Sequence, residues 1–316
     1  MAYGETSSPT AGNAVSYKRQ DMINLVVTLA VISTIVIASL WWLASEWESY
    51  GCYSLSEPLA LCYNCLLAMG TVALLTWHYL DTNPLVVRYT VYGRPDIAAV
   101  TGEFVHLQRW TTFTVWSNTV NTIFFVCAAA QGLLRNPPPA LCKATQITWE
   151  LTFPLAFFVN IVVSFVLIPG IIKLRDWDKL RRILRFKPQM LHNGLALAAA
   201  GEAVLATPPL RLAHFPVLVL FGSVYMVFAW YFFLQTRIFH YFFLDFRFKL
   251  QPIALLLLLG LLAILYAIGA GTLAWASDSV LGRMLIIPAA LATCTWRADR
   301  TSDNGSSPVA SLLSRQ

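Results

Sequence analysis

Seven stretches of this sequence are apolar over a length that can cross a lipid bilayer, and this feature constrains the fold most. A helix needs about 20 predominantly apolar residues to span the hydrocarbon core. Only helices and closed barrels satisfy their backbone hydrogen bonds there. We therefore predict an all-α fold, a polytopic transmembrane helical bundle of about seven spans, or eight if the short apolar segment 284–296 also crosses. The seven stretches are residues 23–44, 59–80, 111–134, 149–172, 189–206, 213–235 and 252–275.

The composition supports this prediction and argues against other classes of protein. Hydrophobic residues make up 57% of the 316-residue chain and charged residues 12%, whereas soluble domains carry about 25% charged residues. The formal net charge is +6, but the basic residues are concentrated in one connecting segment. A nucleic-acid-binding protein would carry them on a folded basic face, so we expect no nucleic-acid partner.

The chain divides into one membrane domain between two polar ends. Residues 1–20 are rich in Ser, Thr and Gly and are typical of a disordered cytoplasmic tail. Residues 21–296 hold all the apolar stretches and are predicted to form the transmembrane helical domain. Residues 297–316 form a polar C-terminal tail.

The distribution of Lys and Arg predicts the orientation in the membrane. With the N-terminus in the cytoplasm, the inner connections before the seventh span carry 15 basic residues and the outer connections carry 3. Cytoplasmic loops carry such an excess, so we predict an integral, multi-pass protein with a cytoplasmic N-terminus. The pattern fits an endomembrane and the plasma membrane equally. Seven spans would place the C-terminus outside, and eight would place it inside.

Seven of the basic residues lie in a single segment that begins with Lys173 and ends with Lys187. Trp177 and Phe186 lie among them, as in an amphipathic segment at the inner leaflet. Basic clusters beside a span bind anionic lipid headgroups, so anionic lipid is one expected partner. The alternative is a connecting loop whose charge only sets the orientation.

The six cysteines do not have the spacing of a metal site. Cys62 and Cys65 form a C-x-x-C pair, but no second Cys or His pair follows at zinc-site distance. We therefore predict no metal. Cys52 lies in the outer connection after the first span, so a disulfide from Cys52 to Cys62 or Cys65 is one expectation. Free membrane cysteines are the other.

The stretch 111–134 carries a polar stripe that would be unfavourable against lipid. At about 3.6 residues per turn, Thr114, Asn118 and Asn121 fall on one helical face. Ser117 and Thr122 flank that face. Such a stripe has to face other helices or a polar cavity. Its amides fit two roles: polarising a substrate carbonyl in an oxyanion site, or hydrogen bonding between helices.

His192 is the ionisable side chain that we expect opposite this stripe. It lies just inside the cytoplasmic end of the fifth stretch, and Thr114 lies about one turn inside the cytoplasmic end of the third. The two residues therefore share a depth, which allows a pair with His192 as general base and Thr114 as nucleophile. The alternative is a threonine bonded to its own helix beside an interfacial histidine.

Two carboxylates, Glu150 and Glu202, are predicted near the outer ends of their spans. Ionisable groups inside spans are rare and are functional hypotheses by default. Glu202 could pair with Arg211 or His214, or meet Glu150 in a proton or cation site. The alternative is a role as helix-end anchors or in a packing network.

An ordered set of short motifs resembles a known family. The set covers roughly residues 105–275 and comprises Phe113-Thr-Val-Trp-Ser-Asn118, Phe124-Phe125, Leu191-His-Asn-Gly194, Glu202, Trp230 and Tyr241-Phe-Phe-Leu-Asp245. These segments look like those of the androgen-induced, six-helix membrane proteins, which include the androgen-dependent regulators of tissue factor pathway inhibitor. The chain is also similar to the bacterial six-transmembrane proteins called Pr6Pr.

The resemblance implies an activity. Characterised members of the androgen-induced group hydrolyse fatty acid esters of hydroxy fatty acids with a membrane-embedded Thr and His. Carried over by motif, Thr114 would be the nucleophile and His192 the base. The expected function is thus an intramembrane lipid ester hydrolase that needs no cofactor and takes its acyl ester from the bilayer. The alternative is a non-enzymatic transporter, channel or lipid-binding scaffold that uses the polar stripe.

Overall fold

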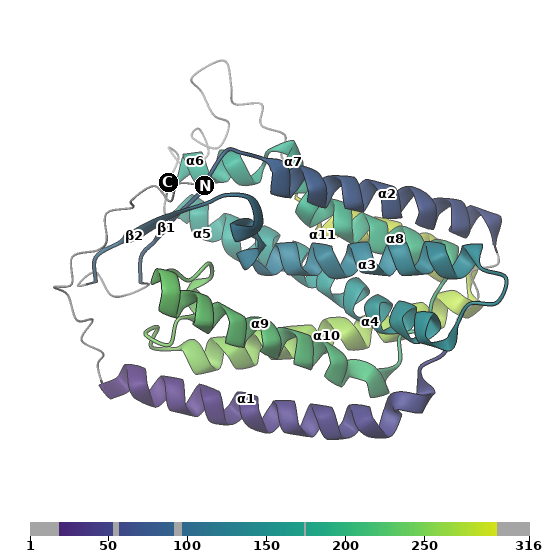
Figure 1. Cartoon of the computed structure of the whole chain (residues 1–316), viewed down its shortest axis with the longest axis horizontal. Helices are drawn as coiled ribbons and strands as arrows, with labels where there is room; N and C mark the ends of the chain where they lie inside the picture. The colour runs from purple at the N-terminus through teal and green to yellow at the C-terminus, as the bar shows by residue number, and fades with distance from the viewer. Residues whose placement is uncertain (1–18, 53–56, 92–96, 174, 296–316) are drawn as a thin grey trace, which may run out of the picture.

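The computed structural model describes residues 19–52, 57–91, 97–173 and 175–295, and within these ranges the predicted all-α bundle is confirmed (Figure 1). Apart from Arg19 and Gln20, the two predicted tails lie outside the described residues. The helices are α1 Arg19–Glu46, α2 Pro58–Leu80, α3 Phe113–Leu133, α4 Pro139–Ile161, α5 Ile168–Lys173, α6 Trp177–Ile183, α7 Phe186–Gln189, α8 Leu195–Leu205, α9 Phe215–Thr236, α10 Gln251–Asp278 and α11 Val280–Thr293.

Six helical segments are long and apolar enough to cross a membrane, and they match six of the predicted spans. They are Arg19–Ser49, Pro58–Leu80, Phe113–Leu133, Pro139–Lys173, Leu212–Thr236 and Gln251–Asp278. The other predicted span, 189–206, is the helical run formed by α7, a π-helical turn at Met190–Gly194 and α8.

The fourth span begins ten residues earlier than the predicted start at Trp149. Pro139, the last of three consecutive prolines ahead of the apolar stretch, is the first residue of α4. Proline suits that position because its missing N–H would have had no helical partner and its φ is already helical. With this earlier start, α4 runs through the middle of the bundle.

The short apolar segment near the C-terminus, α11, packs one face against α8 and α10 and leaves the other exposed. Ser279 caps its start by accepting a hydrogen bond from the backbone N–H of Gly282 at 3.2 Å. Asn160 of α4 donates to the Thr293 hydroxyl at its end, at 2.9 Å. These contacts hold α11 to the bundle, and the eighth span stays a prediction. At about 1.5 Å per residue, α11 is shorter than the hydrocarbon core.

The helices α3 and α4 form the centre, with α2 packed on α3 and with α9 and α10 on the other side (Figure 1). The peripheral helix α1 packs against α9 and turns its polar side chains inward. Asn24 donates to the backbone carbonyl of Phe246 at 3.1 Å, and Thr28 donates to the Gln251 side chain at 2.7 Å. Polar groups that would be costly in lipid thereby become the contacts that hold α1 to the bundle.

The connection between α2 and α3 contains a hairpin that the sequence interpretation missed. Strands β1, Leu85–Tyr89, and β2, Val100–Phe104, pair antiparallel, with Leu85 opposite Phe104. The hairpin lies at the end of the bundle where α3 begins (Figure 1). There the Tyr89 hydroxyl donates a hydrogen bond to Asp245, which also accepts hydrogen bonds from the backbone N–H and the guanidinium of Arg247.

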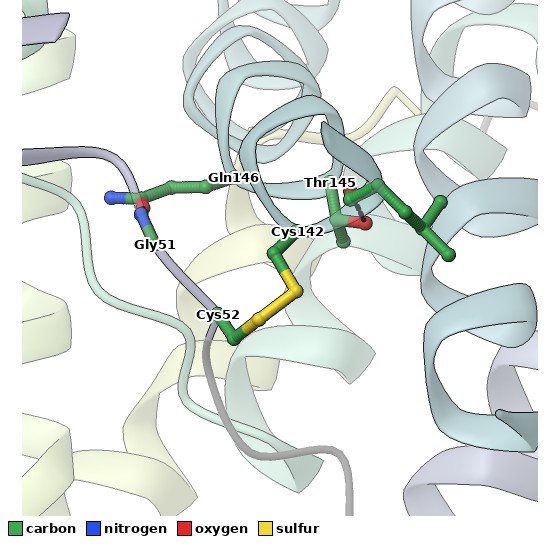
Figure 2. Close-up of a disulfide and its surroundings, with 6 residues drawn as sticks. Gly51, Cys52, Cys142, Thr145 and Gln146 are labelled. Atoms are coloured by element: carbon green, nitrogen blue, oxygen red, sulfur yellow. Dashed lines mark hydrogen bonds between the residues drawn. A yellow bond between two sulfur atoms is a disulfide. The ribbon is translucent and has the colours of Figure 1, made fainter. Parts of the chain in front are cut away.

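A disulfide joins Cys52 to Cys142 and ties the segment after α1 to the first turn of α4 (Figure 2). The expected pairing of Cys52 with Cys62 or Cys65 is wrong; both are free thiols in the described structure. The true partner is 90 residues away in sequence and reaches Cys52 because α4 starts earlier than predicted. Beside the disulfide, the Gly51 N–H donates to the Gln146 side chain at 2.7 Å.

We expect Cys142→Ser to lower the free energy of unfolding by about 2–4 kcal/mol, because the cross-link closes a long loop. Thermal unfolding of the detergent-solubilised protein measures the effect. Cys62→Ser, which removes an exposed free thiol, is the matched control and should melt like the wild type. Equal melting of the two variants would contradict the prediction.

Candidate functional site

The polar stripe on α3 faces protein, as predicted. Its members are all buried, with exposed fractions between 1% and 9%: Thr114, Ser117, Asn118, Asn121 and Thr122. They lie on the helix that packs against α2 and α4. None of these polar groups therefore has to be exposed to lipid.

Most of the stripe is engaged in hydrogen bonds within and between helices. The Asn118 amide donates to the Thr114 carbonyl at 2.8 Å and to the Leu191 carbonyl at 3.0 Å, which links α3 to the π-helical turn before α8. Ser117 donates to the Phe113 carbonyl at 3.0 Å. In the described structure the buried Asn121 amide has no hydrogen-bond partner, so this side chain is the one left open for another group.

His192 lies in that π-helical turn, Met190–Gly194. The Asn118–Leu191 hydrogen bond brings its helix against α3 about one turn further along that helix than Thr114. Within the described ranges, however, no hydrogen bond joins His192 to Thr114, and the buried Nδ1 atom of His192 has no partner. The Thr114–His192 catalytic pair therefore stays a prediction.

A cavity of about 200 Å³ lies between α1, α4, α9 and α10 and reaches the start of α3. Its wall is apolar along almost its whole length, with side chains such as Ile32, Val159 and Leu262. The polar groups in the wall are few: Thr28, Thr114, Ser223, Tyr225 and Tyr241. His192 is not part of this wall.

Three of those polar groups converge where α3 begins. The Tyr225 hydroxyl donates to the Thr111 carbonyl at 3.0 Å. The Tyr241 hydroxyl lies within hydrogen-bonding reach of the Thr114 hydroxyl and of the backbone amides of Phe113 and Thr114. The first turn of a helix leaves such N–H groups without helical partners. Burial raises the pKa of Tyr241, so its hydroxyl stays protonated and can donate to a carbonyl or carboxylate.

A threonine–histidine pair does occur beside this site, but with other residues than predicted. The Thr111 hydroxyl and His240 Nε2 are 2.6 Å apart, and the imidazole stacks on Phe232 with ring centroids 5.2 Å apart. Burial lowers the pKa of His240 to about 4. No local motif marks the pair, because 129 residues separate its members; only the fold brings them together.

The lowered pKa of His240 predicts a loss of stability in mild acid. The unfolded chain takes up this proton near pH 6.5, and the folded protein takes it up only near pH 4. The stabilisation is therefore complete above pH 6.5 and is lost as the pH falls towards 4, by an amount on the order of 3 kcal/mol. The free energy of unfolding should fall more steeply with decreasing pH over this range in the wild type than in His240→Gln. Parallel curves of this free energy against pH would contradict the prediction.

The two intramembrane carboxylates have separate partners. Glu202 accepts a hydrogen bond from the Asn64 amide of α2 at 3.2 Å, so the expected partners Arg211, His214 and Glu150 are wrong for it. Glu150 binds His214 instead, with Nδ1 at 2.7 Å from one carboxylate oxygen and 2.9 Å from the other. Helix packing decides these partners: α2 lies against α8, and α4 against α9.

In the basic segment, Lys173 ends α5, Phe186 and Lys187 begin α7, and Trp177–Ile183 between them form the short helix α6. Its Leu180 is buried, while Lys179 and Arg181 are exposed. Lys187 contacts the Asp81 carboxylate at 2.6 Å, and this hydrogen bond is the main reason why the pKa of Asp81 lies below its usual range. The exposed cations keep the predicted contact with anionic lipid open, and it stays a prediction.

Over the described residues, no three His, Cys, Asp or Glu side chains gather as metal ligands would. Comparison with family models, curated proteins and solved structures finds no match for this chain. The similarity to the androgen-induced family therefore rests on the motifs alone.

Proposed function

We propose that this membrane protein binds one long-chain lipid, with its acyl chain in the cavity and its polar end at the start of α3. The observation that carries the proposal is the wall of the cavity. It is apolar along most of its length between α1, α9 and α10, and three of its few polar groups, Thr114, Tyr225 and Tyr241, gather at the start of α3. Pockets of this kind bind through apolar contact, and a few placed polar groups fix the orientation.

The outer surface supports entry from the bilayer. Val27 and Val31 of α1 and Leu256 of α10 line the cavity and are also exposed on the outside, at 44%, 38% and 56%. In a membrane these side chains would meet lipid tails. An acyl chain that enters beside α1 therefore never has to cross water.

The proposed orientation keeps the N-terminus in the cytoplasm. The basic α6 and the start of α3 lie at one end of the bundle, and the Cys52–Cys142 disulfide lies at the other (Figures 1 and 2). Basic connections favour the cytoplasmic side, and disulfides persist in oxidising compartments. Both features support the same orientation, with the polar end of the cavity near the inner leaflet.

Hydrolysis of the bound lipid is the second candidate, because Thr114 is a hydroxyl group in the cavity wall at the first turn of α3. The Thr114 oxygen would attack an ester carbonyl, and nearby N–H groups and Tyr241 would stabilise the oxyanion. His192 is the base that the family resemblance implies. Its helix is held against α3 through Asn118.

Binding is tested by mass spectrometry of lipid that remains with the purified protein in nanodiscs; we expect an acyl lipid of defined chain length. Hydrolysis is tested by release of fatty acid from a branched fatty acid ester. Loss of turnover in both Thr114→Ala and His192→Ala, with lipid still bound, would support the hydrolase. If the wild type holds a lipid but shows no turnover, the binding proposal stands and the hydrolase is contradicted. If the purified wild type holds no lipid, the main proposal is overturned.

A further inference from the structure

A second group of reactive side chains lies at the other end of the bundle, where α1 ends and α9 begins (Figure 1). Ser49 closes the turn Trp47–Ser49 after α1, and His214 ends the turn Leu212–His214 before α9. The Ser49 hydroxyl lies 2.5 Å from His214 Nε2, and His214 Nδ1 lies 2.7 Å from the Glu150 carboxylate. A hydroxyl, an imidazole and a carboxylate are thus joined in series.

The three side chains of this series differ in their exposure to solvent. Glu150 and His214 are completely buried, whereas Ser49 is partly exposed. Tyr50 stacks on the imidazole, with ring centroids 3.9 Å apart and planes 18° apart. The nucleophile can therefore be reached from outside, while the carboxylate that orients the imidazole is shielded from water, as this chemistry requires.

The backbone around Ser49 is held on several sides. Arg211 donates to the Ser49 carbonyl at 2.7 Å. Two residues on, the Gly51 N–H binds Gln146, whose amide donates to Glu150 at 3.2 Å (Figure 2). The disulfide at Cys52 fixes the same segment to α4. The serine and its acid are thus attached to one rigid element, which keeps the reacting atoms aligned.

We propose that Ser49, His214 and Glu150 form the nucleophile, base and orienting acid of a serine-type acyl hydrolase at this end of the bundle. The end of α1 and the two turns that hold Ser49 and His214 carry exposed apolar side chains: Trp42 at 44%, Trp47 at 49% and Leu212 at 63%. Aromatic residues of this kind lie at the membrane–water interface. The substrate class is therefore an acyl ester of a membrane lipid, presented at that interface. This site is separate from the cavity near Thr114.

The reaction balances with water as the only co-reactant. Ser49 Oγ bonds to the ester carbonyl carbon and passes its proton to His214 Nε2, while Glu150 stabilises the imidazolium. The bond from carbon to the alcohol oxygen breaks, and His214 gives the proton to that oxygen. Water then attacks the acyl-serine, His214 takes its proton and returns it to Ser49 Oγ, and a carboxylic acid leaves. The Ser49 hydroxyl, which also lies 2.6 Å from the Glu46 carbonyl, turns towards His214 for the attack.

The test is labelling of the full-length protein in membranes with a fluorophosphonate probe, followed by mapping of the modified peptide. We expect the adduct on Ser49, with a rate at least about 100-fold lower in His214→Gln, the usual scale for losing a general base. Ser45→Ala is the control, because this exposed serine near the end of α1 bonds, among the described residues, only to the Trp42 carbonyl; its labelling should equal that of the wild type.

Mapping of the wild type decides the question even if His214→Gln does not fold. No adduct on a wild type with an intact melting transition, or an adduct on Thr114 alone, would overturn the triad. Lipid binding in the cavity is measured independently, so failure of either proposal leaves the other standing.

Discussion

Replacing Gly222 with leucine should block lipid binding and leave the fold intact. Gly222 lines the cavity from α9, and a Cβ atom added there has open space around it, with no atom of a packed neighbour within 4 Å. A leucine side chain would therefore project into the space that we assign to the acyl chain. Overpacking of this kind costs about 1–3 kcal/mol, which lowers affinity roughly 5- to 150-fold. The lipid retained by the purified variant, measured by mass spectrometry, should fall accordingly.

Gly260→Leu is the matched control for this prediction. Gly260 is also a helical glycine with open space around it, but it lies on the exposed side of α10 and does not line the cavity. Both substitutions should raise helix propensity, by up to about 1 kcal/mol relative to glycine. Equal retention of lipid by the two variants would show that the cavity is not the binding site.

Asp245→Ala should be the most destabilising of the substitutions considered, by about 3–5 kcal/mol. The Asp245 carboxylate is completely buried and binds the Arg247 guanidinium through two hydrogen bonds of 2.9 Å. It also accepts a hydrogen bond from Tyr89, and burial raises the pKa of that phenol, so it stays a donor. Without the carboxylate, Arg247 would remain buried as an unpaired charge.

Asp178→Ala provides the comparison, because it removes an ion pair of similar length in an exposed place. The Arg181–Asp178 contact is 2.6 Å long, with both side chains mostly exposed, and such surface pairs contribute at most about 1 kcal/mol. Denaturant unfolding of the wild type, Asp178→Ala and Asp245→Ala should give Asp245→Ala a far lower free energy of unfolding than the other two. A loss below about 1 kcal/mol in Asp245→Ala would contradict the buried network.

The spans could be predicted because hydropathy is a local property: each apolar stretch has to satisfy its own backbone as a helix. The start of α4 at Pro139 was missed because the helix begins before the apolar stretch does. The hairpin was missed for a related reason, since β1 and β2 are five residues each and carry little periodicity. Hydropathy thus placed the spans but not the polar elements that connect them.

The site residues depended on packing that no local pattern reveals. Thr114 was identified from its helical face and does line the cavity. Glu150 was identified as an intramembrane carboxylate, but its bond to His214 spans 64 residues. Ser49 has no motif around it and becomes a candidate nucleophile only because the fold of α1 and α9 brings it to that imidazole.

The measurement that tests the central claim most directly is photo-crosslinking of the wild-type protein in membranes with a fatty acid that carries a diazirine midway along its chain. The account predicts adducts on cavity-lining residues of α1, α9 and α10, such as Ile35, Met226 and Leu259, and competition by unlabelled fatty acid. Adducts spread evenly over exposed lipid-facing residues such as Leu66 and Met69 of α2, without competition, would contradict it.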